Sequence, residues 1–214
     1  TPAGKVDFDR HRGKDFPVVI AADNPALQFA LKYRPQLFPR AAIIFCGING
    51  FNLPMIEGHK NVTGVAELLD AEKTLAIALF FHPGTRTVVV VHDYTITGLA
   101  TRRETEEQLK PFADRVNIVY LANMSTRELM EHLQRLPADS LVLALSYSLD
   151  QEGQVINHEM ISRILSQSAT VPVYGLHEER LGFGIVGGSL LGGALQGARA
   201  GVVTEPGPVV QHAV

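Results

Sequence analysis

The sequence predicts an α/β protein of two lobes, each built around a parallel β-sheet. Short apolar runs rich in Val and Ile recur along the chain, and each is followed by a stretch with helical spacing. Several runs have no polar face, which is typical of parallel strands covered on both sides. A loop rich in Asn, Pro and Gly interrupts the pattern after the second strand. Doubly wound layers with right-handed crossovers are therefore expected.

The elements follow from these patterns in order. The strands are expected over residues 17–22, 41–46, 87–92, 116–121, 140–146 and 171–174. The helices are expected over residues 25–33, 71–81, 97–112, 125–136, 158–167 and 189–200. Ser125 and Glu128 have the spacing of a capping box, which predicts a helix start at that point.

The boundary between the lobes is expected at the extended stretch 61–65, after the Asn-, Pro- and Gly-rich loop. Residues 1–63 and 184–214 then form the first lobe, with two strands before the boundary, and residues 64–183 form the second. The chain then crosses twice between the lobes, and residues 206–211 offer a third crossing. Thr63, Gly64, Gly184 and Gly187 are the expected hinge residues, because glycine permits backbone angles that other residues avoid.

Composition limits the function classes. The 19 basic and 22 acidic residues give a net charge of −3, which predicts no nucleic-acid partner. The single cysteine, Cys46, excludes a disulfide within this sequence and any cysteine-based metal cluster. No apolar run is long enough to span a bilayer. The N-terminus shows no secretory signal, which predicts either a cytosolic protein or a mature exported domain.

Ligands of open α/β sheets bind beyond the carboxyl ends of the strands. In the first lobe this rule selects Asp23, Asn24 and Asn49 as ligand-binding candidates, with Glu67 just past the first crossing. Each has a structural alternative. Asp23 or Asn24 can cap the helix that starts at Pro25, Asn49 can form a turn with Gly50, and Glu67 can pair with a surface base.

In the second lobe the same rule selects residues after three strands. A Tyr or Ser there can hold a ligand by stacking and hydrogen bonding, and the Ser-Tyr pair at 146–147 is the strongest candidate. Asp93, Thr95 or Thr97 can instead cap the next helix. The candidates are Asp93, Tyr94, Thr95, Ser146, Tyr147, His177 and Glu178.

The sequence predicts neither a metal nor a cofactor. His177, Glu178 and Glu179 are adjacent, so their side chains point in different directions, whereas metal motifs place ligands on one face. A polar loop is the alternative that we favour. The glycines at 182–193 include no phosphate-loop lysine and no dinucleotide fingerprint, and no serine nucleophile elbow is present. Cys46 lacks an activating partner motif and is expected in the core. A binding module is therefore expected, not an enzyme.

Several sequence blocks together resemble the uncharacterised substrate-binding family of ABC transport systems. They are Phe-Pro at 38–39, Ala-Ile-Ile-Phe-Cys-Gly-Ile-Asn at 42–49, Asn-Val-Thr-Gly-Val at 61–65, His-Pro-Gly-Thr-Arg at 82–86, Pro-Val-Tyr-Gly-Leu at 172–176, and the glycines of 182–188. The block at 42–49 is most similar to extracytoplasmic sensor regions that precede histidine kinase modules. Family members begin with a strand and a helix, of which residues 1–12 supply at most a fragment.

The resemblance implies a type I periplasmic-binding-protein-like fold, with two Rossmann-like lobes joined by a hinge. It also implies a periplasmic or extracytoplasmic domain, membrane-anchored in the full-length protein, that clamps a small molecule. An amino acid, an aromatic acid or a carboxylic acid is the expected ligand class. The expected partners are kinase modules in the same chain or an ABC permease. A doubly wound enzyme and the effector domain of a transcription repressor are the alternatives.

Overall fold

The computed structural model describes residues 14–202 and 210–212. The described chain divides into two compact units, the first formed by residues up to Glu67 and from Ala194 onward, the second by Leu68–Gly193. The chain therefore crosses between the units at Glu67–Leu68 and at Gly193–Ala194. The boundary expected between residues 63 and 64 would cut through a strand, and the return crossing lies ten residues later than expected.

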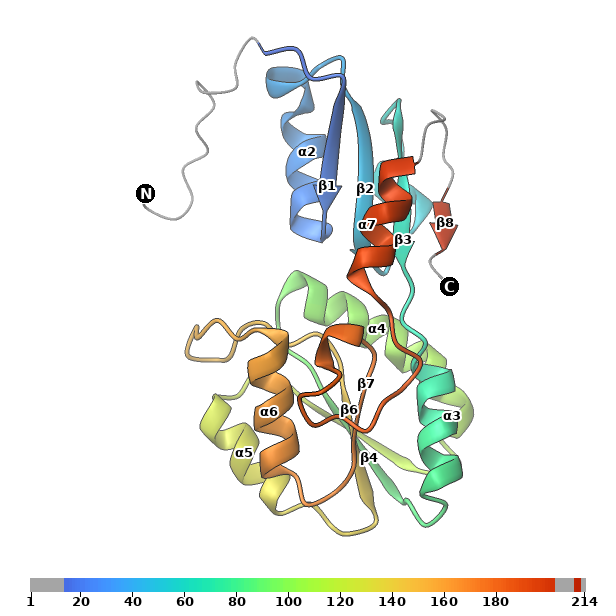
Figure 1. The fold of residues 1–214 in the computed structure, drawn as a ribbon, viewed down its shortest axis with the longest axis vertical. Helices are drawn as coiled ribbons and strands as arrows, with labels where there is room; N and C mark the ends of the chain where they lie inside the picture. Colours follow the sequence, from blue (N-terminus) through green and yellow to red (C-terminus); the bar gives the residue numbers. More distant parts are fainter. Residues whose placement is uncertain (1–13, 203–209, 213–214) are drawn as a thin grey trace. The chain divides into compact units, whose positions relative to one another are not determined.

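The first unit contains a parallel sheet in the order β1-β2-β3-β8 (Figure 1). Its elements are β1 (Val18–Ala22), α2 (Asn24–Leu37), β2 (Ala42–Asn49), the 3-10 turn η1 (Leu53–Ile56), β3 (Val62–Glu67), α7 (Gly193–Val202) and β8 (Val210–His212). The two strands expected before the boundary, β1 and β2, are present, and the sheet also contains β3 and β8, which the sequence did not predict.

The segment expected as the boundary between the lobes instead contains most of the strand β3, and Gly64 explains the difference. Gly64 lies in the middle of β3, and a Cβ at this position would come within 2.1 Å of the Phe45 carbonyl oxygen on β2. Only glycine allows the two strands to approach so closely. A glycine in a short apolar run is also typical of a loop. The same residue that permits the pairing therefore made the segment resemble a linker.

The second unit contains a parallel sheet in the order β5-β4-β6-β7. Its elements are α3 (Ala71–Phe81), β4 (Thr87–Val91), α4 (Ile96–Leu109), η2 (Lys110–Phe112), β5 (Asn117–Leu121), α5 (Thr126–Gln134), β6 (Ser140–Ala144), α6 (His158–Ser168), β7 (Val173–Gly175) and η3 (Glu178–Arg180). The expected helix-strand alternation is confirmed here, with end shifts of a few residues.

Helices cover both faces of this second sheet, as the all-apolar strands predict. Along β4, Val88 and Val90 join one core with Leu75 of α3, while Val89 and Val91 join a second core with Leu165 of α6. All four valines are almost fully buried. Each contributes roughly 1.5–3 kcal/mol relative to an exposed position, so these cores fix the sheet that positions the loops.

The capping box at the start of α5 is confirmed. The Ser125 backbone amide donates to the Glu128 carboxylate over 2.8 Å, and the Glu128 amide donates to the Ser125 hydroxyl over 3.3 Å. These bonds from Ser125 lower the pKa of Glu128. Both ends of the motif therefore satisfy amides that the helix itself leaves without partners.

The glycine-rich segment folds within the second unit. Residues 189–191 run beside residues 176–178, since His177 forms a parallel bridge with Leu191, and α7 begins only at Gly193. The expected hinge residue Gly184 packs on Ser166 of α6, and the Gly187 carbonyl accepts a bond from the Gly175 amide. Thr63 and Gly64 lie inside β3. All four lie within a unit, not at the crossing points.

Candidate functional site

The carboxyl end of β1 leads into a strained residue. Asp23 has φ 77° and ψ 157°, a combination that residues with a side chain rarely adopt and that costs about 1–3 kcal/mol. Its amide donates to the Cys46 carbonyl over 2.9 Å, and its carboxylate accepts from the Asn24 amide over 2.7 Å. The capping role of Asp23 at α2 is therefore present.

Asn24 and Asn49 form a reciprocal pair across the end of the first sheet. The Asn24 side-chain amide donates to the Asn49 carbonyl, and the Asn49 backbone amide donates to the Asn24 side-chain oxygen, both over 2.9 Å. Both residues are buried. The side chain of Asn24 thus continues the β1–β2 pairing past the end of β1, to the last residue of β2. The Asn49 Oδ1 atom is buried and has no hydrogen-bond partner among the described residues.

Gln196 of α7 reaches the same edge of the first sheet. Its Oε1 atom accepts from the Gly47 amide over 2.8 Å, whereas its Nε2 atom is buried without a partner in the part of the chain that the structure describes. A side chain on Gly47 would approach the carboxylate of Glu67. Burial and the nearby Glu67 charge raise the pKa of the Cys46 thiol, so Cys46 stays protonated and unreactive at neutral pH.

In the second unit Asp93 serves as an internal tie. One carboxylate oxygen accepts from the Thr95 amide and hydroxyl, and the other accepts from the Ser148 amide and hydroxyl and from the Leu149 amide. Asp93 is only 1% exposed. The Thr95 hydroxyl also caps α4 by accepting from the Gly98 amide over 3.1 Å. Both side chains therefore hold the loops after β4 and β6 together.

Tyr147, half of the strongest sequence candidate, lies in the core between the second sheet and α5 and α6. Its phenol donates to the Met124 carbonyl over 3.3 Å, and burial raises its pKa to about 12. Ser146 is half-buried, and its carbonyl accepts from the Asp93 amide. Tyr94 is more exposed and donates to the Asp150 carbonyl over 3.0 Å. The geometry favours an internal role for Tyr147.

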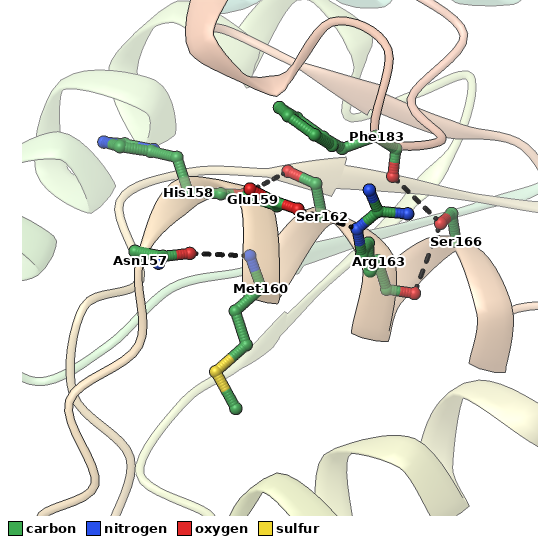
Figure 2. A network of polar contacts seen from close by, with 8 residues as sticks. All are labelled: Asn157, His158, Glu159, Met160, Ser162, Arg163, Ser166 and Phe183. Carbon is green, nitrogen blue, oxygen red and sulfur yellow. Dashed lines mark hydrogen bonds and ion pairs between the residues drawn. The ribbon is translucent and has the colours of Figure 1, made fainter.

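His177 and Glu178 follow β7 as expected, but the structure groups His177 with residues that the sequence did not indicate. His177 is buried, and its ring lies 5.3 Å from that of His158, measured between centroids. His158 begins α6, and its imidazole points away from the helix (Figure 2). Glu178 is exposed and lies beside Gly192. Three or more metal-ligating side chains gather nowhere within residues 14–202.

Arg180 is the most unusual residue of this unit. It ends η3, and it has no exposed surface. One guanidinium nitrogen, Nη2, donates to the Leu145 carbonyl over 2.5 Å, just past the end of β6. The Nε and Nη1 atoms have no partner among the residues described. Burial lowers the pKa of Arg180 to about 10, against the opposing effect of Glu179, so the guanidinium remains charged at neutral pH.

Sequence reasoning thus missed Gln196 and Arg180, which both have buried nitrogens without partners among the described residues. Gln196 lies far along the chain from β2, and no local pattern indicates its contact with Gly47. Arg180 follows two glutamates, which is typical of an exposed polar turn. The strand-end rule did find Asn24 and Asn49, which the structure brings together.

Comparison with known proteins identifies the fold. A conserved domain protein from Vibrio cholerae O1 biovar El Tor matches with a TM-score of 0.61 and 19% identity over 92% of this chain and 68% of that one. The ABC domain from Streptococcus pneumoniae, in complex with L-Trp, matches with a TM-score of 0.53 and 15% identity over 77% of this chain. A xylose-binding transcription activator matches with a TM-score of 0.52 and 14% identity over 76% of this chain.

These likenesses, together with the two parallel sheets, show a type I periplasmic-binding-protein-like fold. The chain spans 56% of the length of the ABC domain and 43% of that of the transcription activator. No protein-family model and no curated protein matches the sequence. Among the described helices, none has the length and apolar character needed to cross a bilayer.

Proposed function

We propose that this protein is an extracytoplasmic binding domain that clamps a small organic solute with contacts from both units. One observation carries the proposal. The carboxyl edge of the first sheet holds a buried donor, Gln196 Nε2, and a buried acceptor, Asn49 Oδ1, without partners among the described residues. Buried polar atoms are almost always hydrogen-bonded in native proteins, so a solute that supplies the missing partners explains both.

The connections between the units support the same proposal. The first crossing leaves the first unit directly after β3 and enters the second unit just before the start of α3. The second crossing follows the segment after β7 and enters α7, whose Gln196 contacts Gly47. In each unit, therefore, the linking chain attaches at the carboxyl edge of the sheet. This is the edge at which ligands of α/β proteins bind.

The proposed mechanism is a shift in population. Contacts made with both units exist only in a closed form, so a solute favours closure by the free energy of those added contacts. Backbone changes near Glu67–Leu68 and Gly193–Ala194 would supply the hinge. In the full-length protein, closure would act through a membrane-anchored terminus on a histidine kinase, as the resemblance of the 42–49 block implies.

A substrate-binding component of an ABC transporter is the second candidate. The likeness to the Streptococcus pneumoniae ABC domain favours it, and that domain binds L-Trp. In this role the closed form would dock on a permease. The two candidates require the same solute site and differ in the sequence that flanks it. Neither requires catalysis, and the enzyme alternative has no observation in its favour.

The experiment is a thermal-shift screen of the protein against amino acids, aromatic and carboxylic acids, sugars and purines, with L-tryptophan as the first compound. A solute at 100 times its Kd stabilises the folded protein by about 2.7 kcal/mol, which raises Tm by several degrees. If no compound class raises Tm, solute binding is contradicted. A stabilising solute that leaves the radius of gyration in X-ray scattering unchanged contradicts closure alone.

Matched variants locate the site. The Gln196→Met variant removes the buried donor, and we expect it to weaken binding of the hit about tenfold, the effect of one lost hydrogen bond. Gln36 is an exposed residue of α2 in the same unit, so Gln36→Met should leave binding unchanged. Equal affinities for the Gln196→Met variant and the wild type would show that the solute binds elsewhere.

A further inference from the structure

The second unit contains a buried cation that it does not neutralise. Arg180 has no exposed surface, and only its Nη2 atom has a hydrogen-bond partner among the described residues. Burying an unpaired charge is costly, and arginines in protein interiors normally face a carboxylate or several carbonyl groups. The charge of Glu179 acts on Arg180, but no hydrogen bond joins the two among the described residues, and the Glu179 carboxylate accepts a bond from the Gly193 amide over 3.1 Å.

Arg180 lies at the carboxyl edge of the second sheet, where α/β folds of this class bind ligands. Its Nη2 atom contacts the Leu145 carbonyl beyond β6, and its Cδ atom lies against Gly175 at the end of β7. The guanidinium therefore lies under the carboxyl ends of two adjacent strands. The strand order predicts ligand binding between the ends of β4 and β6. There, however, Asp93 joins the loops after these two strands to each other and closes that position.

Two exposed side chains, Glu179 and His158, lie near the guanidinium. Glu179 is exposed, and His158 keeps an exposed surface at the start of α6, where Figure 2 shows its imidazole pointing away from the helix. Neither belongs to a hydrophobic core. Glu179 is bonded to Gly193, the last residue before the second crossing, so displacement of its carboxylate would also act on the link between the units.

We infer that Arg180 is an anion-binding residue and that it holds the carboxylate of the bound solute, with His158 and His177 beside it. This inference rests on the proposed function and names the ligand class as carboxylic acids, amino acids included. A planar carboxylate matches the planar guanidinium and can accept two parallel N–H bonds from it.

The test uses small carboxylates, because they carry the proposed group without the rest of a solute. Sodium formate and acetate are titrated at constant ionic strength against the 15N-labelled protein. The Nε–Hε resonance of Arg180 is assigned by its loss in the Arg180→Met variant. We expect both carboxylates to shift this resonance with a saturating dependence on concentration and to raise Tm. In the Arg180→Met variant we expect the affinity read from the Tm increase to be about tenfold lower or more.

Two controls keep the inference falsifiable. Arg127→Met replaces an exposed arginine of α5 and should retain the full response. Arg180→Lys keeps the charge with fewer donors, and it should retain a reduced response if Arg180→Met does not fold. An Arg180 resonance that neither carboxylate moves contradicts the inference. Inorganic phosphate that binds more tightly than both carboxylates assigns the site to a phosphate and contradicts the carboxylate class.

The failure of this inference is distinct from failure of the proposed function. A sugar or purine that stabilises the wild type and the Arg180→Met variant equally leaves solute binding standing and removes Arg180 from the site. A carboxylate response at Arg180, in a protein that binds no larger solute in the screen, has the opposite meaning. It supports the anion site and contradicts the solute clamp.

Discussion

The carboxylate of Asp93 accepts two hydrogen bonds from Ser148, one from the backbone amide over 2.5 Å and one from the hydroxyl over 2.9 Å. Asp93 follows β4 and Ser148 lies in the loop after β6, so the pair joins the ends of two adjacent strands. Gly98 packs directly on the same carboxylate, where a Cβ would approach one oxygen to 2.0 Å. The loop ends are therefore fixed before any ligand binds.

The first prediction follows from this tie. Asp93→Ala leaves the amides and hydroxyls of Thr95 and Ser148 without their acceptor. We expect a loss of about 3 kcal/mol in the free energy of unfolding, measured by urea denaturation with the slope unchanged. Asp114→Ala changes an exposed aspartate in the same unit and should alter stability by less than about 0.5 kcal/mol. Equal stabilities of the two variants would show that Asp93 is not a structural tie.

Replacing either of two glycines by alanine should change the stability of the protein, but in opposite directions. Gly64→Ala drives a methyl group into the Phe45 carbonyl, so we expect it to destabilise the protein by about 3 kcal/mol or more. Gly197 lies within α7, where a Cβ meets no atom within 4 Å, and Gly197→Ala should stabilise the helix by about 0.5–1 kcal/mol. Thermal and urea unfolding of both variants test this. Two changes of the same sign would contradict the prediction.

The alternation of strands and helices was predictable from the sequence because it depends on patterns among residues close together in the chain. All-apolar runs such as the one that became β4 are typical of strands covered on both faces, and the capping box of α5 depends on two residues three positions apart. The strand β3 was not predictable in this way. Whether Gly64 marks a loop or a close strand pairing depends on Phe45, a distant residue on another strand.

The residues of the candidate site show the same difference between local patterns and tertiary contacts. Asn24 and Asn49 were selected separately because each was expected after a strand, and the structure joins them at one edge of the sheet. Arg180 was missed because its burial depends on tertiary contacts, with Leu145 past β6 and with Gly175 of β7. The sequence also could not indicate that Tyr147 packs between the sheet and the helices. Its position after β6 suits a ligand contact, but the core formed with α5 and α6 contains its ring.

His158 gives a prediction about pH. Desolvation of the imidazole, aided by the charges of Arg180 and His177 and opposed by Glu179, lowers the pKa of His158 to about 4, from 6.5. The unfolded chain therefore binds a proton between pH 6.5 and 4 that the folded chain does not, so stability falls as pH decreases through this window. Since His158 keeps an exposed surface, the loss is on the order of 1 kcal/mol.

The comparison for His158 is the His158→Gln variant. Its free energy of unfolding, measured by urea titration at pH 4 to pH 7, should change less across this range than that of the wild type. His132 lies in the last turn of α5, and His132→Gln serves as the matched control. Parallel pH profiles for all three proteins would show that His158 does not titrate abnormally.

Tyr147 gives the last prediction, which separates a core role from a ligand contact. Tyr147→Phe keeps the ring and removes only the bond to the Met124 carbonyl, so it should cost about 0.5–1.5 kcal/mol and leave solute affinity unchanged. Burial raises the phenol pKa to about 12, and the wild type should lose stability as pH rises from 10 toward 12 because only the unfolded chain ionises there. Tyr147→Phe should lack that loss. A tenfold drop in solute affinity for Tyr147→Phe, with stability unchanged, would instead place the phenol against the ligand.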